Sequence, residues 1–133
     1  MSQSDARSPR PPREKIFNAP FLPLLIAASM PVLYYLQERL PDLGVSMAFV
    51  PARLWAGDWQ GLFTSMLLHG GWAHVTMNAV AALAFGAPVA RLMERGPGPL
   101  VFILFYIAAG VVAALGYGLV HPHSMGPLVG ASG

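Results

Sequence analysis

The apolar stretch LLHGGWAHVTMNAVAALAFG, residues 67–86, has the composition of a membrane-spanning helix but contains two histidines and an asparagine. Polar side chains are costly in the hydrocarbon core, where they are usually paired or functional. On a helix that turns about 100° per residue, His74 and Asn78 lie roughly 40° apart and share a face, whereas His69 lies roughly 140° from His74. The spacing therefore predicts that His74 and Asn78 form a pair.

The composition of the whole chain indicates a membrane protein. Of its 133 residues, 55% are hydrophobic and only 11% are charged, which is too apolar for an ordinary soluble surface. Because the chain has no cysteine, disulfides and thiolate metal sites are excluded. The basic residues are not gathered into one stripe, and the aromatic residues lie within apolar runs, so nucleic-acid binding is not expected.

Three apolar segments are long enough to cross a bilayer as helices. They are Phe17–Leu36, Leu62–Ala90 and Leu100–Val120. The Pro- and Gly-containing stretch RLMERGPGP, residues 91–99, separates the last two. Residues 1–15, MSQSDARSPRPPREK, have the composition of a disordered tail. We therefore expect a disordered tail at residues 1–15 and one helical membrane domain at residues 16–133.

The basic residues predict the orientation of these segments. Most of them precede the first span or follow the second, and only two lie between the first two spans. The positive-inside rule then places the N-terminus in the cytoplasm, and we expect an integral multi-pass protein of a bacterial inner membrane. The residues that carry this expectation are Arg7, Arg10, Arg13, Lys15, Arg91 and Arg95, against Arg39 and Arg53.

Helical rise places the polar pair near the outer surface. If Arg91 marks the cytoplasmic interface, Asn78 lies about 20 Å and His74 about 26 Å above it, in a core about 30 Å thick. His69 would then reach the outer headgroups. By parity, the segment after the third span, which ends in GASG at residues 130–133, also begins on the outer side. Ser132 could therefore meet His74 and Asn78 in one pocket below the outer surface.

Such a pocket suits acyl transfer. A serine attacks a carbonyl carbon, and fixed donors such as Asn and His side chains stabilise the negative charge on the tetrahedral oxygen. Gly130 and Gly133 leave room for a substrate backbone and allow backbone angles that bulkier residues resist. A helix that starts at Ser132 would add positive potential from its free N–H groups.

Other interpretations of these residues remain open. Asn78 can make an interhelical hydrogen bond, and His74 can be an interfacial side chain; the residues alone give this interpretation about equal weight. A metal site from His69 with His74, or from His121 with His123, is weaker because neither pair has carboxylate or cysteine partners. A piece of a transporter or channel would explain the polar residues but would leave GASG unexplained.

The combination of HGGWAHVTMN in the second span, GASG near the end and this topology resembles the rhomboid intramembrane serine proteases, over residues 19–133. The resemblance implies a six-helix bundle whose fourth helix begins at a nucleophilic serine, here Ser132. It also implies that His74 and Asn78 line the oxyanion hole beside the backbone N–H of Ser132, that Gly130 is the motif glycine, and that His69 is a supporting residue. No cofactor is implied, and the partners are transmembrane protein substrates in the lipid bilayer, cleaved near the outer face; the resemblance leaves the oligomeric state unknown.

The sequence departs from the family pattern at two points. The family often has a Trp-Arg pair before the second helix, where this chain has Trp59 and Gln60. The family's general base is a histidine on the sixth helix, and this chain has no counterpart. We therefore expect an N-terminal fragment of a serine endopeptidase that is inactive and not stably folded alone. The alternative is a non-catalytic rhomboid-like protein that binds transmembrane helices.

Overall fold

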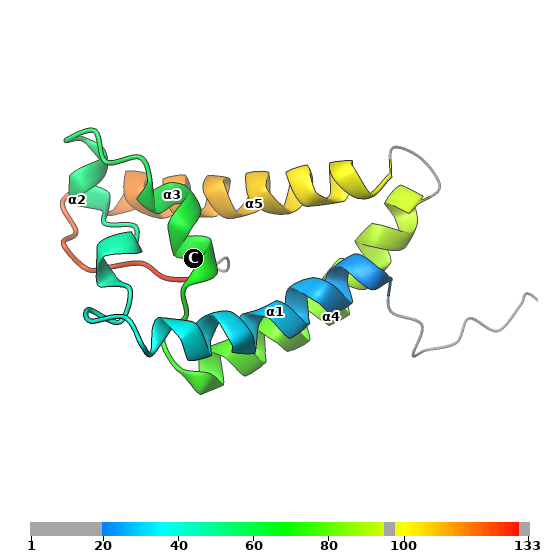
Figure 1. Ribbon diagram of the computed structural model, residues 1–133. Helices are drawn as coiled ribbons and strands as arrows, with labels where there is room; N and C mark the ends of the chain where they lie inside the picture. Colours follow the sequence, from blue (N-terminus) through cyan, green and yellow to red (C-terminus); the bar gives the residue numbers. More distant parts are fainter. Residues whose placement is uncertain (1–19, 95–97, 131–133) are drawn as a thin grey trace, which may run out of the picture.

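The computed structural model describes residues 20–94 and 98–130 of the chain. Three long helices dominate this part: α1 (Phe21–Gln37), α4 (Trp72–Glu94) and α5 (Pro99–Val120). Figure 1 shows α1 and α4 lying side by side, with α5 on the opposite side of the molecule. The expected tail, residues 1–15, and the expected helix start at Ser132 lie outside the described residues.

Four short helical segments connect α1 to α4. They are η1 (Val45–Met47), α2 (Pro51–Leu54), α3 (Gly61–Thr64) and η2 (Ser65–Leu67). They gather at the end of the molecule where α1 stops and α4 starts, and the segment after α5 turns back among them (Figure 1). Within the described residues, the only extended pairing is one antiparallel bridge between Phe49 and Leu128.

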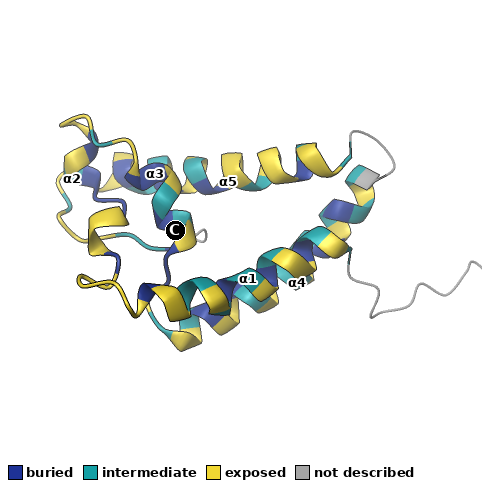
Figure 2. Ribbon diagram, in the orientation of Figure 1, coloured by how far each residue is buried: buried dark blue, intermediate teal, exposed yellow. Residues whose placement is uncertain are grey.

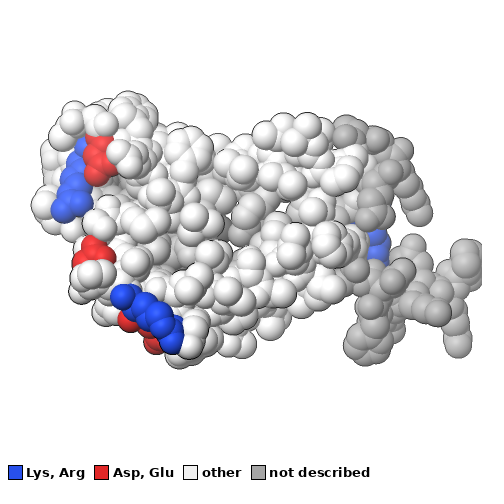
Figure 3. Space-filling view, viewed as in Figure 1, with Lys and Arg blue, Asp and Glu red and all other residues white. Residues whose placement is uncertain are grey.

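The long helices have the character of membrane-spanning segments. By length and composition, α4 and α5 can each cross a bilayer, whereas α1 is an apolar helix of 17 residues. Large apolar side chains of these helices remain exposed, for example Leu36 of α1 and Val120 of α5. Exposed surface runs along all three long helices (Figure 2). Acidic and basic side chains gather at the end that carries α2, and an uncharged band separates them from a basic group at the other end (Figure 3).

Small residues allow α1 and α4 to approach closely. Ala27 of α1 and Ala90 of α4 are buried, and a side chain on Gly86 of α4 would contact Pro23 at 3.4 Å. Small residues serve the same purpose in other membrane helix pairs, where packing, rather than exclusion of water, drives association. The first and third spans therefore form helices where the sequence predicts them, within the described residues.

The second predicted span, Leu62–Ala90, is wrong at its start. The helix begins only at Trp72, because Leu68 is extended and the pair Gly70 and Gly71 breaks the helical path, Gly71 with φ +152°. The composition stays apolar through this break, so hydropathy alone predicted one continuous span where the structure has short helical segments followed by α4. The ten residues before Trp72 belong to the connecting segments.

A buried cluster holds the connecting segments against the end of α5. Phe49 is fully buried and packs with Leu54, Leu62 and Ala114. A side chain on Gly118 of α5 would meet the Phe49 ring at 3.1 Å, so glycine is needed for this approach. Phe49 also exchanges two backbone hydrogen bonds with Leu128, at 3.1 and 2.7 Å. This cluster therefore fixes the path of the chain that leads to Gly130.

Candidate functional site

His74 lies in the first turn of α4, and its ring is oriented by the glycine pair before the helix. The backbone N–H of Gly70 donates to Nδ1 of His74 at 3.2 Å. A neutral imidazole has one donor and one acceptor nitrogen. Because Nδ1 accepts here, the neutral ring carries its proton on Nε2. His74 can therefore donate a hydrogen bond from the nitrogen that faces away from Gly70.

Asn78 follows one helical turn later, and 9% of its surface is exposed. Its amide nitrogen is buried and has no hydrogen-bond partner among the residues that the structure describes. Buried polar groups are nearly always hydrogen-bonded, and an unpaired one costs about 1–3 kcal/mol. An unsatisfied donor at this position is therefore a feature that calls for a partner.

Gly130 meets both side chains from the opposite direction. Its N–H donates to the carbonyl oxygen of Ser65 at 2.8 Å, and its φ is +93°. A Cβ on Gly130 would lie 2.8 Å from Nε2 of His74 and 3.3 Å from the amide nitrogen of Asn78. The structure thus brings His74, Asn78 and Gly130 together, with no space for a side chain on the glycine.

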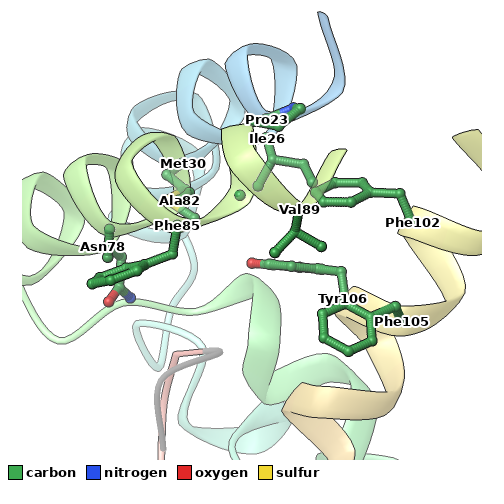
Figure 4. A pocket seen from close by; sticks show the side chains of 12 residues that line it. Pro23, Ile26, Met30, Asn78, Ala82, Phe85, Val89, Phe102, Phe105 and Tyr106 are labelled. Carbon is green, nitrogen blue, oxygen red and sulfur yellow. The ribbon is translucent and has the colours of Figure 1, made fainter. Parts of the chain in front are cut away.

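Asn78 also lies at one end of an apolar cavity of about 400 Å³ between α1, α4 and α5. In Figure 4, Tyr106 from α5 points across this space toward α4, and Phe85 and Val89 line the side formed by α4. The walls are almost entirely hydrocarbon. The amide of Asn78 therefore borders an apolar space, and in such low-polarity surroundings hydrogen bonds to a negative oxygen are strong.

The expectation for His69 is wrong in two respects. His69 precedes α4, is 2% exposed, and does not reach an outer polar surface. Its ring meets that of His74 edge-on at 5.6 Å and that of Tyr34 at 6.5 Å, so the predicted separation on two helix faces does not occur. The helical angle fails because no helix joins His69 to His74. Burial lowers the pKa of His69, and the neighbouring His74 lowers it further.

Two other expected sites have different outcomes. Ser132, the expected nucleophile, lies outside the described residues, as does Gly133. Among the residues that the structure describes, no three His, Cys, Asp or Glu side chains gather where they could hold a metal ion. His121 instead stacks on Tyr117, with ring centroids 4.5 Å apart.

The connecting segments contact one another closely, although Gln60 occupies the position where the resemblance led us to expect an arginine. The hydroxyl of Thr64 donates to the carbonyl oxygen of Met47 at 2.6 Å. A Cβ on Gly61 would lie 2.8 Å from Cα of Phe49, so the two backbones are in close contact. These contacts join α3, at Gly61 and Thr64, to the segment that contains Met47 and Phe49.

Sequence reasoning missed Gln37, the last residue of α1. Its side chain is 8% exposed and bonds to the backbone of His69, which immediately precedes the glycine pair. A glutamine at the end of an apolar run is ordinarily taken as an interfacial residue. The sequence shows only that a polar side chain ends an apolar run, which does not identify the backbone groups with which it forms hydrogen bonds.

Comparison with known proteins gives a consistent result. The family model described as the Rhomboid domain matches residues 56–133. Rhomboid protease GluP of Bacillus subtilis (strain 168) is 35% identical over 77 residues, which are 58% of this chain and 14% of that protein. RHOMBOID-like protein 9, chloroplastic, of Arabidopsis thaliana is 38% identical over 78 residues, 59% of this chain and 16% of that protein.

The chain thus covers less than a fifth of the length of either relative. No solved structure matches it at a significant level. The family model, however, covers more than half of the chain, including His69, His74, Asn78 and Gly130. On that match, together with its apolar helices, this chain is a membrane protein that belongs to the rhomboid family.

Proposed function

We propose that this chain carries the nucleophile and the oxyanion-stabilising donors of an intramembrane serine endopeptidase, which cleaves membrane-anchored proteins near the outer face of the membrane. Ser132 is the nucleophile, and His74 and Asn78 stabilise the oxyanion. The general base is a histidine contributed by a later helix, as the family resemblance implies. The observation that carries the proposal is the convergence of Nε2 of His74 and the amide of Asn78 on Gly130.

Covalent geometry links this convergence to Ser132. Consecutive Cα atoms are 3.80 Å apart, so a residue two positions after Gly130 lies within about 7.6 Å of it. Chain connectivity therefore keeps the proposed nucleophile near the glycine that both donors approach, which supports the proposal. The amide nitrogen of Asn78 lacks a hydrogen-bond acceptor among the described residues. The oxygen of a substrate carbonyl next to Ser132 would be such an acceptor.

The reaction follows from these roles. The oxygen of Ser132 forms a bond to the substrate carbonyl carbon, its proton passes to the general base, and the carbonyl electron pair moves to the oxygen. His74 and Asn78 donate to that oxygen as its charge develops, which lowers the barrier only if both donors are already in place. Gly130 contributes by its missing side chain, because a methyl group there would occupy the space beside both donors.

We also propose that the chain crosses the membrane several times, with its N-terminus in the cytoplasm of a bacterial cell. The uncharged band between the two charged ends supports this arrangement (Figure 3). Because this chain has no native cysteine, single cysteines can report its orientation. A membrane-impermeant maleimide added to spheroplasts should label Asp58→Cys and leave Gly96→Cys unlabelled; the reverse pattern would overturn the orientation.

The activity is tested in the full-length protein, reconstituted in vesicles with a model transmembrane substrate. Ser132→Ala should abolish cleavage and the reaction with a fluorophosphonate. Asn78→Ala should lower kcat about 100-fold, the usual effect of removing one oxyanion donor. Thr76→Ala is the matched control, because Thr76 is an exposed residue of the same helix and, among the described residues, its hydroxyl donates to the carbonyl oxygen of Trp72 in the preceding turn. Normal cleavage by Ser132→Ala would refute the proposal.

A further inference from the structure

The side chain of Gln37 joins the end of α1 to the segment that precedes α4. Its amide nitrogen donates to the carbonyl oxygens of Leu43 at 3.0 Å and His69 at 2.9 Å. Its amide oxygen accepts from the backbone N–H of His69 at 2.9 Å. A buried glutamine thus uses both ends of its amide, and two of its three bonds are to one residue.

One peptide group connects Gln37 to His74. The carbonyl of the peptide between His69 and Gly70 accepts from Gln37, and the N–H of the same peptide donates to Nδ1 of His74. The two bonds are made at opposite edges of one rigid peptide plane, so together they fix its orientation. Hydrogen bonds in such a chain also polarise and strengthen one another.

This arrangement decides which nitrogen of His74 carries the proton. As long as the Gly70 N–H points at Nδ1, the neutral ring must be protonated at Nε2, the nitrogen closest to Gly130. Glycine imposes little preference of its own on the backbone, so the peptide before Gly70 needs an external restraint. The amide of Gln37 supplies that restraint at the carbonyl of His69.

We propose that Gln37 is a positioning residue for His74: through the peptide between His69 and Gly70, it holds the imidazole in the form that donates from Nε2. The inference rests on the proposed function for its effect on catalysis. Its effect on the proton position of His74 does not depend on any activity. The two can therefore fail separately.

The test uses two substitutions of Gln37 in the full-length protein. Gln37→Met keeps the length of the side chain and removes all three hydrogen bonds. Gln37→Glu, in its ionised form, keeps an acceptor for the N–H of His69 but has no donor for the carbonyl, so it is measured at alkaline pH. Gln60→Met is the matched control, because it makes the same chemical change on an exposed glutamine.

The readout is ¹⁵N NMR of histidine-labelled protein in detergent micelles, with the His74 signals assigned by their loss in His74→Asn. In the wild type and in Gln60→Met, Nδ1 should have the shift of an unprotonated acceptor and Nε2 that of an N–H. Both Gln37 variants should show averaged shifts of two tautomers. With a transmembrane substrate, kcat should fall about 10-fold to 100-fold, as expected for a displaced catalytic group, while KM changes little.

Each outcome decides the inference. Averaged shifts in the Gln37 variants, with melting temperatures that still indicate a folded protein, support it. Wild-type shifts in both variants overturn it, whatever happens to kcat. If both variants fail to fold, Gln37 serves the fold alone and the inference is overturned. If the wild type itself does not cleave, the proposed function fails, and the NMR result still decides the role of Gln37.

Discussion

Replacing Gly130 with alanine tests the closest contact in the candidate site. The added methyl carbon would lie 2.8 Å from both Cε1 and Nε2 of His74. Carbon atoms pack best at about 3.5–4.0 Å, so the ring or the segment at Gly130 has to move by about 0.7–1.2 Å. A displacement of about 1 Å in a catalytic group can reduce a rate about 100-fold. We therefore expect Gly130→Ala to lower kcat by about two orders of magnitude.

The same substitution also strains the backbone, and this second effect needs a control. Gly130 has φ +93°, a conformation that costs a residue with a side chain about 1–2 kcal/mol. Gly57 has φ +92°, and a Cβ there would meet nothing within 4 Å. Gly57→Ala therefore reproduces the strain without the collision with His74.

The assay measures cleavage of a transmembrane substrate by the full-length protein, together with its thermal unfolding in detergent. Both variants should lose about 1–2 kcal/mol of stability from the positive φ, and Gly130→Ala should lose more, because its methyl group also collides with His74. Only Gly130→Ala should lose activity in addition. If the two variants cleave at the same rate, the contact between Gly130 and His74 has no catalytic consequence, and the reasoning is refuted.

Three further predictions concern stability, each measured by thermal unfolding in detergent. Phe49→Ala should cost about 3–5 kcal/mol, because the ring is fully buried; a loss below 1 kcal/mol would show that the cluster is not cohesive. Gly110→Ala should destabilise by about 1 kcal/mol or more, because the methyl group meets Met66, whereas Gly116→Ala, with open space around it, should be neutral or slightly stabilising; equal effects would contradict this. The folded state lowers the pKa of His69, so the unfolded chain binds more protons at mildly acidic pH. The free energy of unfolding should therefore be highest above about pH 6.5 and fall as the pH decreases below it. His69→Gln should flatten this pH dependence, and an unchanged slope would exclude His69 as its source.

Structural features that depend on helical periodicity or on the length of an apolar segment could be predicted from the sequence. The third span was expected at Leu100–Val120, and α5 runs from Pro99 to Val120. The boundary is clear because Gly98 adopts φ +82° and Pro99 occupies the first helical turn, where its missing N–H costs nothing. His74 and Asn78 share a face for a similar reason, since both belong to one uninterrupted helix.

Features that depend on the chain turning back on itself were not predictable. The stretch before Trp72 is as apolar as the helix that follows, so composition could not show that Gly70 and Gly71 interrupt it. The burial of His69 depends on this interruption, because a turn rather than a helix carries the ring inward. Gln37 was missed for the same reason, since His69, to which it makes two of its three hydrogen bonds, lies 32 residues away in sequence.

The bridge between Phe49 and Leu128 also bears on the order in which the molecule is assembled. It closes a very long loop, whose entropic cost rises with length, and contacts between residues so distant in sequence form late in folding. Both α4 and α5 lie between the two paired segments in the sequence, so we expect these helices to form before the segments pair. A chain still entering the bilayer would thus carry His74 and Asn78 on a finished helix while the backbone that faces them was not yet docked. Under the proposed function, such an order would delay hydrolytic competence until the surrounding helices are assembled.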